Sequence, residues 1–554
     1  MISKIKLKFG STPGRPALDT NTTPITVFVG PNNSGKSKVL TEIYTFCVNG
    51  IVNGGNLILD HLVYKPIANP ESEIIKHTLS PRQNEFIQPG QIIFGKGPYR
   101  VQIRKESLLT ILSDVASNRQ DYSNYYVSFN TTMIDGQSRI GLIEPQQAGD
   151  LQGHPQTSLQ VLFKDNSKRH EVRRIIKDAF KKFFVIDPTS LGQFRIRLSD
   201  VAPSDDMQER GIHEDAVNFH SKALDIALAS DGVKAFTGII TTLIAGDPKV
   251  ILIDEPEAFL HPSLAANLGK EVSNSVNGST KNLFVSTHSA YFLMGCIQSG
   301  TPINIIRLTY SNNVATARIL PSEKVLRVMR HPLLRSVGVL NGLFYEYVIV
   351  TEGDADRAFY QEINERLLMF TSKGIPNCLF LNAQNKQTIH EIMNPLRGMG
   401  IPCAAIVDVD VIKEGGTVWS NLLNSAFIPS LTVSSTATSR SHIKGRFDEK
   451  RIDFKKNGGV DILDPSDKEA CNNLFDQLDE YGIFTVRKGE LESWLRGLGV
   501  VSKHSPEWLI QIFEKLGEDS TSQNYVKPDD GDVWEFVAKI GEWFTNPNKK
   551  GIPD

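Results

Sequence analysis

The segment 30–37 constrains the fold of this chain more than any other part of its sequence. It reads Gly-Pro-Asn-Asn-Ser-Gly-Lys-Ser and follows an apolar run at 25–29 that is typical of a buried strand. Glycines let backbone N–H groups wrap a phosphate, Lys36 would neutralise that phosphate, and the Ser37 hydroxyl can bind Mg²⁺. The pattern predicts a strand, a phosphate-binding loop and a helix to about Phe46. The residues expected around a bound nucleotide are Gly30, Pro31, Asn32, Asn33, Ser34, Gly35, Lys36 and Ser37.

Two later strand ends carry side chains that suit nucleotide hydrolysis. An apolar run at 251–253 leads into Asp254 and Glu255, and another at 283–286 leads to His288. We expect Asp254 to join the Mg²⁺ shell, Glu255 to orient or deprotonate the attacking water, and His288 to lie near the γ-phosphate. A lone histidine at a strand end is usually structural, but its position after the other two motifs favours a function.

These motifs resemble those of the ATP-binding-cassette class of ATPases, which includes the SMC proteins. The resemblance implies ATP as the nucleotide, and a signature segment that caps the nucleotide bound by a second subunit. Ser230-Asp231-Gly232 precedes Asp254 at the expected place, although Asp231 departs from the usual glycine. A helix cap explains Ser230 and Asp231 almost as well. As a signature, Ser230 and Gly232 imply a homodimer or a higher homo-oligomer formed through the ATPase domains. The candidates for the implied glutamine loop are Gln137, Gln146 and Gln147.

A second group of acids lies far downstream, among alternating strand and helix patterns. Glu352 follows the strand-like run 347–350, Asp356 comes four residues later, and Asp408 and Asp410 follow the run 404–407. Ligand sites of parallel sheets lie beyond the carboxyl ends of the strands, so these carboxylates are expected to converge. No lysine or arginine partner for them is evident in the sequence, and like charges this close need a cation. Oxygen ligands of this kind suit Mg²⁺ or Mn²⁺, which predicts a two-metal site for phosphodiester cleavage.

The order of these acids resembles that of a TOPRIM domain, the metal-binding fold of primases, topoisomerases and some nucleases. Taken singly, such acids often only cap a strand end. In nuclease-type TOPRIM domains a later strand supplies a further acid and a basic residue. The resemblance implies these roles for Glu490 or Glu492 and for Lys488, and the choice between the two glutamates stays open.

An ATP-binding-cassette-like ATPase followed by a TOPRIM domain is similar to the OLD (overcoming lysogenisation defect) family of nucleases, which includes the nuclease subunit of the Gabija antiphage system. The resemblance covers an ATPase domain at about 1–335 and a TOPRIM domain at about 345–500. It implies an ATP-regulated, metal-dependent DNA endonuclease of antiphage defence, with a helicase or another defence protein as partner. One alternative is a TOPRIM ribonuclease toxin acting on tRNA, as in PARIS proteins. Another is an SMC-like DNA-binding ATPase whose second domain is structural.

The expected fold is α/β throughout, with subdomains inserted into the ATPase domain at about 50–230. Strand-like pieces at 91–94 and 126–129 indicate an antiparallel part of this insert. Helical patterns cover 171–183 and 214–229 within it, and 354–368, 386–398 and 467–481 downstream. A C-terminal helical tail is expected at 501–554.

Composition narrows the setting in which the chain works. The net charge of −2 gives no overall attraction to nucleic acid. The basic stretch 440–456 is therefore the local candidate for contact with the nucleic-acid backbone, and a solvated loop without such a contact is the equal alternative. The five cysteines lie at no ligand spacing, which fits a reducing cytoplasm. No apolar run approaches the roughly 20 residues that span a bilayer, so no membrane contact is expected.

Overall fold

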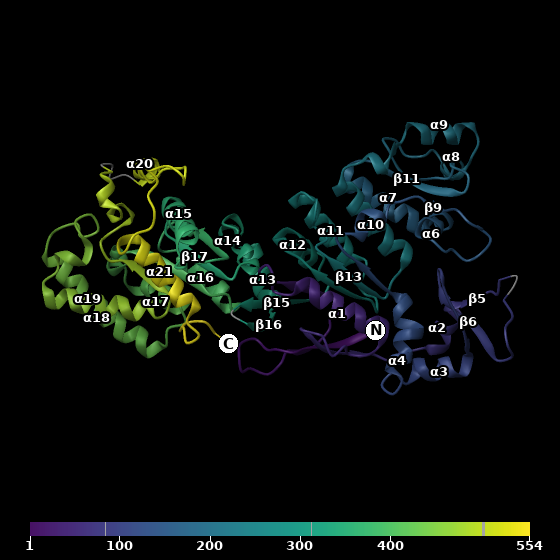
Figure 1. Cartoon of the computed structure of the whole chain (residues 1–554), viewed down its shortest axis with the longest axis horizontal. Coiled ribbons are helices and arrows are strands. Elements are labelled where there is room, and N and C mark those ends of the chain that lie inside the picture. The colour runs from purple at the N-terminus through teal and green to yellow at the C-terminus, as the bar shows by residue number, and fades with distance from the viewer. Residues whose placement is uncertain (83–84, 312, 501–504, 554) are drawn as a thin grey trace. The chain divides into compact units, whose positions relative to one another are not determined.

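The computed structural model describes residues 1–82, 85–311, 313–500 and 505–553. The chain divides into two compact units, Met1–Ser322 and Glu323–Asp554, and each unit has its own central sheet (Figure 1), which is mixed in the first unit and parallel in the second. The second unit begins at Glu323, before the boundary expected at 335–345. The segment between them contains the helices α13 (Ser322–Arg330) and α14 (Pro332–Ser336). They fall in the second unit from Glu323 on.

A six-stranded sheet with the order β16-β15-β3-β14-β13-β8 forms the centre of the first unit. Its strands are β3 (Ile25–Val29), β8 (Thr131–Ile134), β13 (Val250–Asp254), β14 (Asn282–Ser286), β15 (Ile303–Ser311) and β16 (Val314–Leu320). All neighbours run parallel except β15 and β16, which are antiparallel. Every residue of β3 is buried, as expected where a parallel sheet is covered on both faces. Helix α1 (Lys36–Asn49) contacts β13, β14 and β8.

Two small antiparallel sheets flank this centre. One has the order β2-β1-β4 and the other β5-β6-β7. The bounds are β1 (Ile2–Leu7), β2 (Asp19–Asn21), β4 (Leu59–Tyr64), β5 (Thr78–Leu79), β6 (Gln91–Lys96) and β7 (Tyr99–Arg104), with helices α2 (Pro70–His77) and α3 (Lys105–Ser113). The strand expected at 91–94 is thus present in β6.

The strand expected at 126–129 is wrong. Helix α4 (Arg119–Tyr122) continues into a π-helical turn at Ser123–Val127 and a 3₁₀ turn at Ser128–Asn130. The rings of Tyr126 and Phe129 pack edge to face, 5.9 Å apart, and both contact His77. Aromatic residues favour strands only through their packing, and here that packing is made by helical turns.

The remaining part of the insert is mainly helical. It contains α5 (Ser138–Gly141), β9 (Gln146–Gln147), α6 (Ser158–Lys164), α7 (Asn166–Phe180), β10 (Phe183–Asp187), β11 (Gln193–Ser199), α8 (Asp206–Arg210), α9 (Glu214–Lys222) and β12 (Leu224–Asp225). The helix expected at 214–229 ends at Lys222, because Leu224 and Asp225 pair with β11. Helices α10 (Asp231–Gly246), α11 (Pro262–Asn274) and α12 (Ala290–Gln298) complete the unit.

The second unit contains a four-stranded parallel sheet with the order β18-β17-β19-β20. Its strands are β17 (Tyr347–Thr351), β18 (Cys378–Asn382), β19 (Cys403–Asp408) and β20 (Ile483–Val486). Helices α15 (Asp354–Phe370), α16 (Ile389–Gly398) and α19 (Pro465–Asp479) match the expected helices closely. Helices α17 (Gly416–Ser425) and α18 (Ser430–Glu449) lie between β19 and α19 in the chain.

The C-terminal segment belongs to the core of the second unit. Helices α20 (Ser505–Leu516) and α21 (Asp532–Thr545) confirm the expected helical character, while 501–504 and 554 lie outside the described residues. The Trp508 ring is 2 % exposed and contacts Phe359 of α15 edge to face, at 5.2 Å. Trp508, Trp534 and Trp543 are buried in the same hydrophobic core as the residues of β17 and α15. Because burial of apolar side chains is the main stabilising contribution in folding, these helices are part of the domain.

Candidate functional site

The phosphate loop has the backbone conformation that its glycines predict. Gly30 has φ 147°, and a Cβ at this position would lie 2.0 Å from the carbonyl oxygen of Leu308. Gly35 has φ 91° and would clash with Ile58 in the same way, at 2.4 Å. Residues other than glycine could not hold this loop without displacing its neighbours, so the shape needed to cradle a phosphate group is built in.

Lys36 points into the loop that it follows. Its Nζ donates hydrogen bonds to the carbonyl oxygens of Gly30 and Pro31 at 2.9 and 2.7 Å. Burial lowers the pKa of Lys36 to about 8, against the raising effect of Glu255 and Asp254. A phosphate in the loop would restore the preference for the charged ammonium. These residues therefore fit a nucleotide.

Asp254, Glu255 and His288 meet at the carboxyl ends of β13 and β14. Asp254 lies opposite Ser286 and accepts a hydrogen bond from its hydroxyl. The Oε1 of Glu255 is 3.3 Å from Nε2 of His288. Burial lowers the pKa of His288, and the positive charge of Lys36 lowers it further. The structure thus brings together three of the side chains that the sequence assigns to hydrolysis.

Glu257 is a neighbour of this group that sequence reasoning missed. Its Oε1 accepts a hydrogen bond from the backbone N–H of His288 at 2.7 Å, and burial raises its pKa. The only available signal was one more acid two residues after Glu255, which is too common a pattern to interpret.

Ser230 is the N-cap residue of α10, but within the described chain its hydroxyl makes no capping hydrogen bond. A Cβ on Gly232 would lie 2.6 Å from the carbonyl oxygen of Phe259, so Gly232 is held closely against the segment that follows β13. This geometry suits the signature role of both residues, which remains a prediction.

The three glutamine candidates occupy different places. Gln146 is engaged within the insert, where its Oε1 accepts a hydrogen bond from Leu159 N at 2.9 Å. Gln147 pairs with Gln193 of β11. Gln137 instead follows β8, whose last residue Ile134 lies opposite Ile253. We therefore favour Gln137, because it shares the sheet edge with Asp254.

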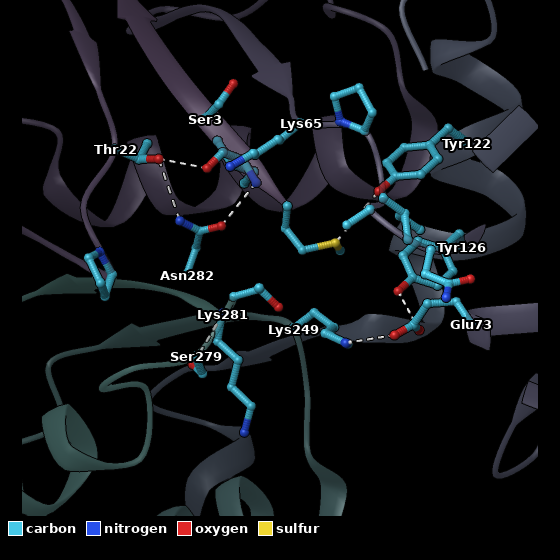
Figure 2. A pocket seen from close by; sticks show the side chains of 18 of the residues that line it. Ser3, Thr22, Lys65, Glu73, Tyr122, Tyr126, Lys249, Ser279, Lys281 and Asn282 are labelled. Carbon is cyan, nitrogen blue, oxygen red and sulfur yellow. Dashed lines mark hydrogen bonds and ion pairs between the residues drawn. The ribbon is translucent and has the colours of Figure 1, made fainter. Parts of the chain in front are cut away.

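A pocket of about 550 Å³ opens at the other edge of the central sheet (Figure 2). Lys249 and Asn282, where β13 and β14 begin, both line it. Figure 2 shows Lys249 directed at Glu73, with 3.4 Å between Nζ and Oε1. Asn282 accepts a hydrogen bond from Ile2 N at 2.9 Å. Since this edge is opposite the phosphate loop, the pocket is not the candidate nucleotide site.

In the second unit, Glu352, Asp408 and Asp410 form one acidic cluster. A carboxylate oxygen from each lies within 4.8 Å of the other two. Glu352 follows β17 and Asp408 ends the neighbouring strand β19, so the carboxyl edge of the sheet brings them together. The Oε1 of Glu352 also accepts a hydrogen bond from Asp408 N at 2.9 Å. The convergence expected from the sequence is present.

The cluster offers the donor set of a divalent cation. Asp408 and Asp410 are each 9 % exposed. Within the described residues, Oδ1 of Asp410 is buried without a hydrogen-bond partner. Buried polar atoms are normally satisfied, so an orphaned oxygen calls for an explanation such as an ion. Three carboxylates at this spacing fit Mg²⁺ or Mn²⁺.

The acids do have lysine partners, contrary to the expectation from the sequence. Nζ of Lys386 is 2.8 Å from Asp410 Oδ2 and 3.2 Å from Glu414 Oε1. Nζ of Lys455 is 2.8 Å from Asp408 Oδ2 and 3.9 Å from Asp410 Oδ2. Both lysines come from segments remote in sequence from the acids, which is why their pairing was not visible.

Burial and mutual repulsion shift the acids strongly toward their protonated forms. Burial, followed by the negative charge of Asp408, raises the pKa of Glu352 to about 8 and that of Asp356 to about 7. Burial and the charge of Glu492 raise the pKa of Glu490 to about 7. A cation among these groups would reverse the shifts.

The other predicted ligands lie around the cluster. Oδ2 of Asp356 accepts a hydrogen bond from Gly353 N at 3.1 Å, which caps the first turn of α15. Glu490 is 3.7 Å from Lys455 Nζ, and the charge of Glu492 raises the pKa values of both Asp356 and Asp408. Both glutamates are therefore near the acids, and the structure does not choose between them.

The basic residues that contact the cluster are Lys386 and Lys455, whereas the side chain of Lys488, for which the role was predicted, is exposed. Residues 440–449 of the basic stretch lie in the helix α18, so the loop expected there is wrong for this part, whereas residues 450–456 lie in the turns and loop that follow the helix. Several charges of the basic stretch are paired with acids. These pairs are Lys444 with Asp448 at 3.3 Å, Arg446 with Glu449 at 3.1 Å, and Lys450 with Asp464 at 2.8 Å.

Comparison with known proteins finds one family match in each of the two units. Residues 79–294 match the AAA_21 family, whose description reads "AAA domain, putative AbiEii toxin, Type IV TA system". Residues 343–410 match the TOPRIM domain of the overcoming lysogenization defect protein-like family. The chain is 26% identical to the Old nuclease of Escherichia phage P2 over 314 residues, which are 52% of this chain and 50% of that protein. The chain thus spans about half the length of this curated relative.

Solved structures of SMC head domains are also similar. One is bound to the C-terminal winged-helix domain of ScpA, with 14% identity over 59% of this chain and 99% of that chain, at a TM-score of 0.34. Another, from Thermotoga maritima, has 12% identity over 58% of this chain and 99% of that chain, at 0.31. Because these TM-scores are low, the fold assignment depends on the family matches and the sheet topology. The chain combines an AAA-type ATPase domain with an OLD-like TOPRIM domain. Among the described residues, no helix has the length and apolarity needed to cross a membrane.

Proposed function

We propose that this chain is a metal-dependent TOPRIM endonuclease that cuts DNA and is regulated by its own ATP-binding domain. The observation that carries the proposal is the meeting of Glu352, Asp408 and Asp410 within 4.8 Å at the carboxyl edge of a parallel sheet. The OLD-like TOPRIM match and the likeness to the Old nuclease support it.

In this proposal the acidic cluster binds Mg²⁺ or Mn²⁺ through Glu352, Asp408 and Asp410. Such ions supply positive charge to the attacking and leaving oxygens of a phosphodiester. Asp356 and one of Glu490 and Glu492 would complete the ligand set. Lys455 is placed to contact a phosphate oxygen once its carboxylate partners are engaged elsewhere.

At the nucleotide site, Lys36 would hold the phosphates of ATP, with Ser37 and Asp254 around its Mg²⁺. Glu255 would accept a proton from the attacking water, and His288 would orient the water or the γ-phosphate. Ser230 and Gly232 would contact the nucleotide of a second copy, which makes the functional form a homodimer or a higher homo-oligomer.

The setting of this activity follows from the likeness to the Old nuclease and from the family resemblance. We infer a cytoplasmic protein of antiphage defence that acts on DNA more readily than on RNA. We also infer a helicase or another defence protein as its partner.

The test is a plasmid cleavage assay with Mg²⁺ or Mn²⁺, with and without ATP. Glu352→Ala should abolish strand scission and retain ATP binding, because Glu352 lies in the other unit from the phosphate loop. Lys36→Ala should lose ATP binding and retain an intact acidic cluster. Cleavage that persists in purified Glu352→Ala protein would remove the nuclease assignment. A parallel digest of total tRNA tests for a ribonuclease.

A further inference from the structure

Arg139 lies directly behind the two acids of the candidate ATPase site. It belongs to α5, which follows β8, and it is 1 % exposed. Its Nη1 donates a hydrogen bond to the carbonyl oxygen of Glu255 at 2.7 Å, and its Nη2 donates one to the carbonyl oxygen of Asp254 at 2.6 Å. Buried guanidinium groups usually face carboxylates, whereas Arg139 holds the main chain that carries the two acids.

The main chain at Glu255 has an unusual conformation that this contact holds in place. Glu255 has φ 48°, in the left-handed region that residues with a side chain rarely adopt. Its N–H donates to the carbonyl oxygen of Ser286 at 3.0 Å, and its C=O accepts from Arg139 and, at 3.0 Å, from the backbone N–H of Ala258. The residue is therefore fixed from both sides. Conformations of this kind persist only where the surroundings impose them, and they cluster at functional sites.

The backbone conformation of Glu255 determines the direction in which its side chain points. With its backbone in this conformation, Glu255 Oε1 lies 3.3 Å from Nε2 of His288. Loss of Arg139 would remove one of the two donors to this carbonyl group and leave only the Ala258 N–H. The main chain at Glu255 would then be held less firmly, and its carboxylate would be directed less precisely.

The same short helix also contacts the segment that carries the signature. A Cβ on Gly238 of α10 would lie 3.0 Å from the carbonyl oxygen of Arg139, so α5 and α10 are in close contact. Ser230 is the N-cap of α10, and Gln137 precedes Arg139 by two residues. Arg139 thus lies where the glutamine loop, the strand-end acids and the signature helix come together.

We propose that Arg139 is a positioning residue for ATP hydrolysis, which holds Glu255 in the backbone conformation that directs its carboxylate to the attacking water. It touches neither nucleotide nor water in this role. The inference assumes the ATPase activity proposed above and adds to it the residue that sets the geometry of the general base.

The test compares steady-state ATP hydrolysis of the wild type with Arg139→Ala and Arg139→Lys. Misplacement of a catalytic group by about 1 Å costs up to about 100-fold in rate. We expect kcat to fall by about 10- to 100-fold in Arg139→Ala, with KM within about threefold. Arg139→Lys should retain an intermediate kcat, and added guanidinium ion should partly restore kcat in Arg139→Ala but not in the wild type.

Arg169 provides the matched control. It is also fully buried, but it lies in the insert, where it pairs with Glu209 and Asp206 at 3.0 Å each. Arg169→Lys should lower the melting temperature and leave kcat unchanged.

The outcomes separate the two proposals. A wild type without ATP turnover refutes the proposed ATPase and this inference with it. A wild type that turns over ATP, together with an Arg139→Ala variant of equal kcat, or one whose loss appears only in KM, overturns the role of Arg139 alone. If Arg139→Ala does not fold, Arg139→Lys decides the question. An unchanged kcat in Arg139→Lys overturns the positioning role of Arg139, whereas a kcat that falls in Arg139→Lys but not in Arg169→Lys supports it.

Discussion

The phosphate loop of the first unit and the acidic cluster of the second unit occupy the same place in their sheets but have opposite electrostatics. Both lie beyond the carboxyl ends of parallel strands. Burial lowers the pKa of Lys36 to about 8, whereas burial raises the pKa of Glu352 to about 8. In each site, therefore, burial disfavours the charged form of the key side chain, which is the ammonium of Lys36 in the first and the carboxylate of Glu352 in the second. The first is suited to an anion and the second to a cation, since an opposite charge restores the ionised form.

Replacement of Lys36 should affect the nucleotide site and leave the acidic cluster unchanged. Lys36→Ala should weaken ATP binding by about 100-fold or more, because a buried ammonium beside the phosphates is lost. Mn²⁺ binding at the acidic cluster should be unchanged. Calorimetric titration with ATP and with Mn²⁺ measures both. A parallel loss of Mn²⁺ affinity would show that the sites are not independent.

The pH dependence should differ between the sites. Raised pKa values of about 7 for Asp356 and Glu490 and about 8 for Glu352 mean that the folded, metal-free protein binds more protons than the unfolded chain in this range. The contribution of these groups to stability is thus present at low pH and is lost as the pH rises from about 4.5 to about 8.

Cation binding must displace the same protons, so Mn²⁺ affinity should rise about tenfold or more between pH 6 and pH 8. ATP affinity should fall by no more than about twofold over this range, because Lys36, with a pKa of about 8, is still about half charged at pH 8 and a bound phosphate favours its charged form. Titrations at three pH values check this contrast. Equal pH slopes for the two ligands would contradict it.

A smaller effect is expected from the lysines that pair with the acids. Lys386 competes with a cation for Asp410, so Lys386→Gln should tighten Mn²⁺ binding by about 3- to 10-fold, in line with the coupling energies of partly buried charge pairs. Lys488→Gln is the matched control, because its side chain is exposed, and should change Mn²⁺ affinity by less than about twofold. Weaker Mn²⁺ binding in Lys386→Gln would mean that the lysine supports the site rather than competing for it.

The smallest effect concerns nucleic acid. Lys456 is exposed and lines a pocket with Glu490 and Glu492, whereas Lys444 is paired with Asp448 on α18. Loss of one phosphate contact should weaken DNA binding by about 2- to 5-fold in Lys456→Gln and less in Lys444→Gln. Fluorescence anisotropy of labelled DNA, with Ca²⁺ in place of Mg²⁺, measures the affinity of each variant for DNA. Equal losses in both variants would assign the contact to the basic stretch 440–456 as a whole rather than to Lys456.

The sequence predicts the phosphate loop more completely than it predicts the acidic cluster. The phosphate loop is contiguous, so its residues and its conformation follow from one motif. Glu352 and Asp408 are distant in sequence, but both follow strands of one parallel sheet, and the sheet geometry alone brings them together. Lys386 and Lys455 could not be assigned as their partners, because side chains that approach across loops leave no periodic signal.

Other errors have the same origin in tertiary packing. The 126–129 segment has the composition of a strand, but its aromatic rings are buried by helical turns. Trp508 lies in the core of the second unit, although the sequence predicted only a helical tail for this segment. Arg139 gave no signal because its partners are main-chain carbonyl groups, and these depend on the fold rather than on residue types.

Binding of a divalent cation by Glu352, Asp408 and Asp410 can be measured by Mn²⁺ titration, followed by electron paramagnetic resonance in the absence of nucleotide. Saturable Mn²⁺ binding should occur in the wild type and in Lys36→Ala, and it should be lost in Glu352→Gln, which retains the shape of the side chain without its charge. Identical titrations of the wild type and Glu352→Gln would contradict the account.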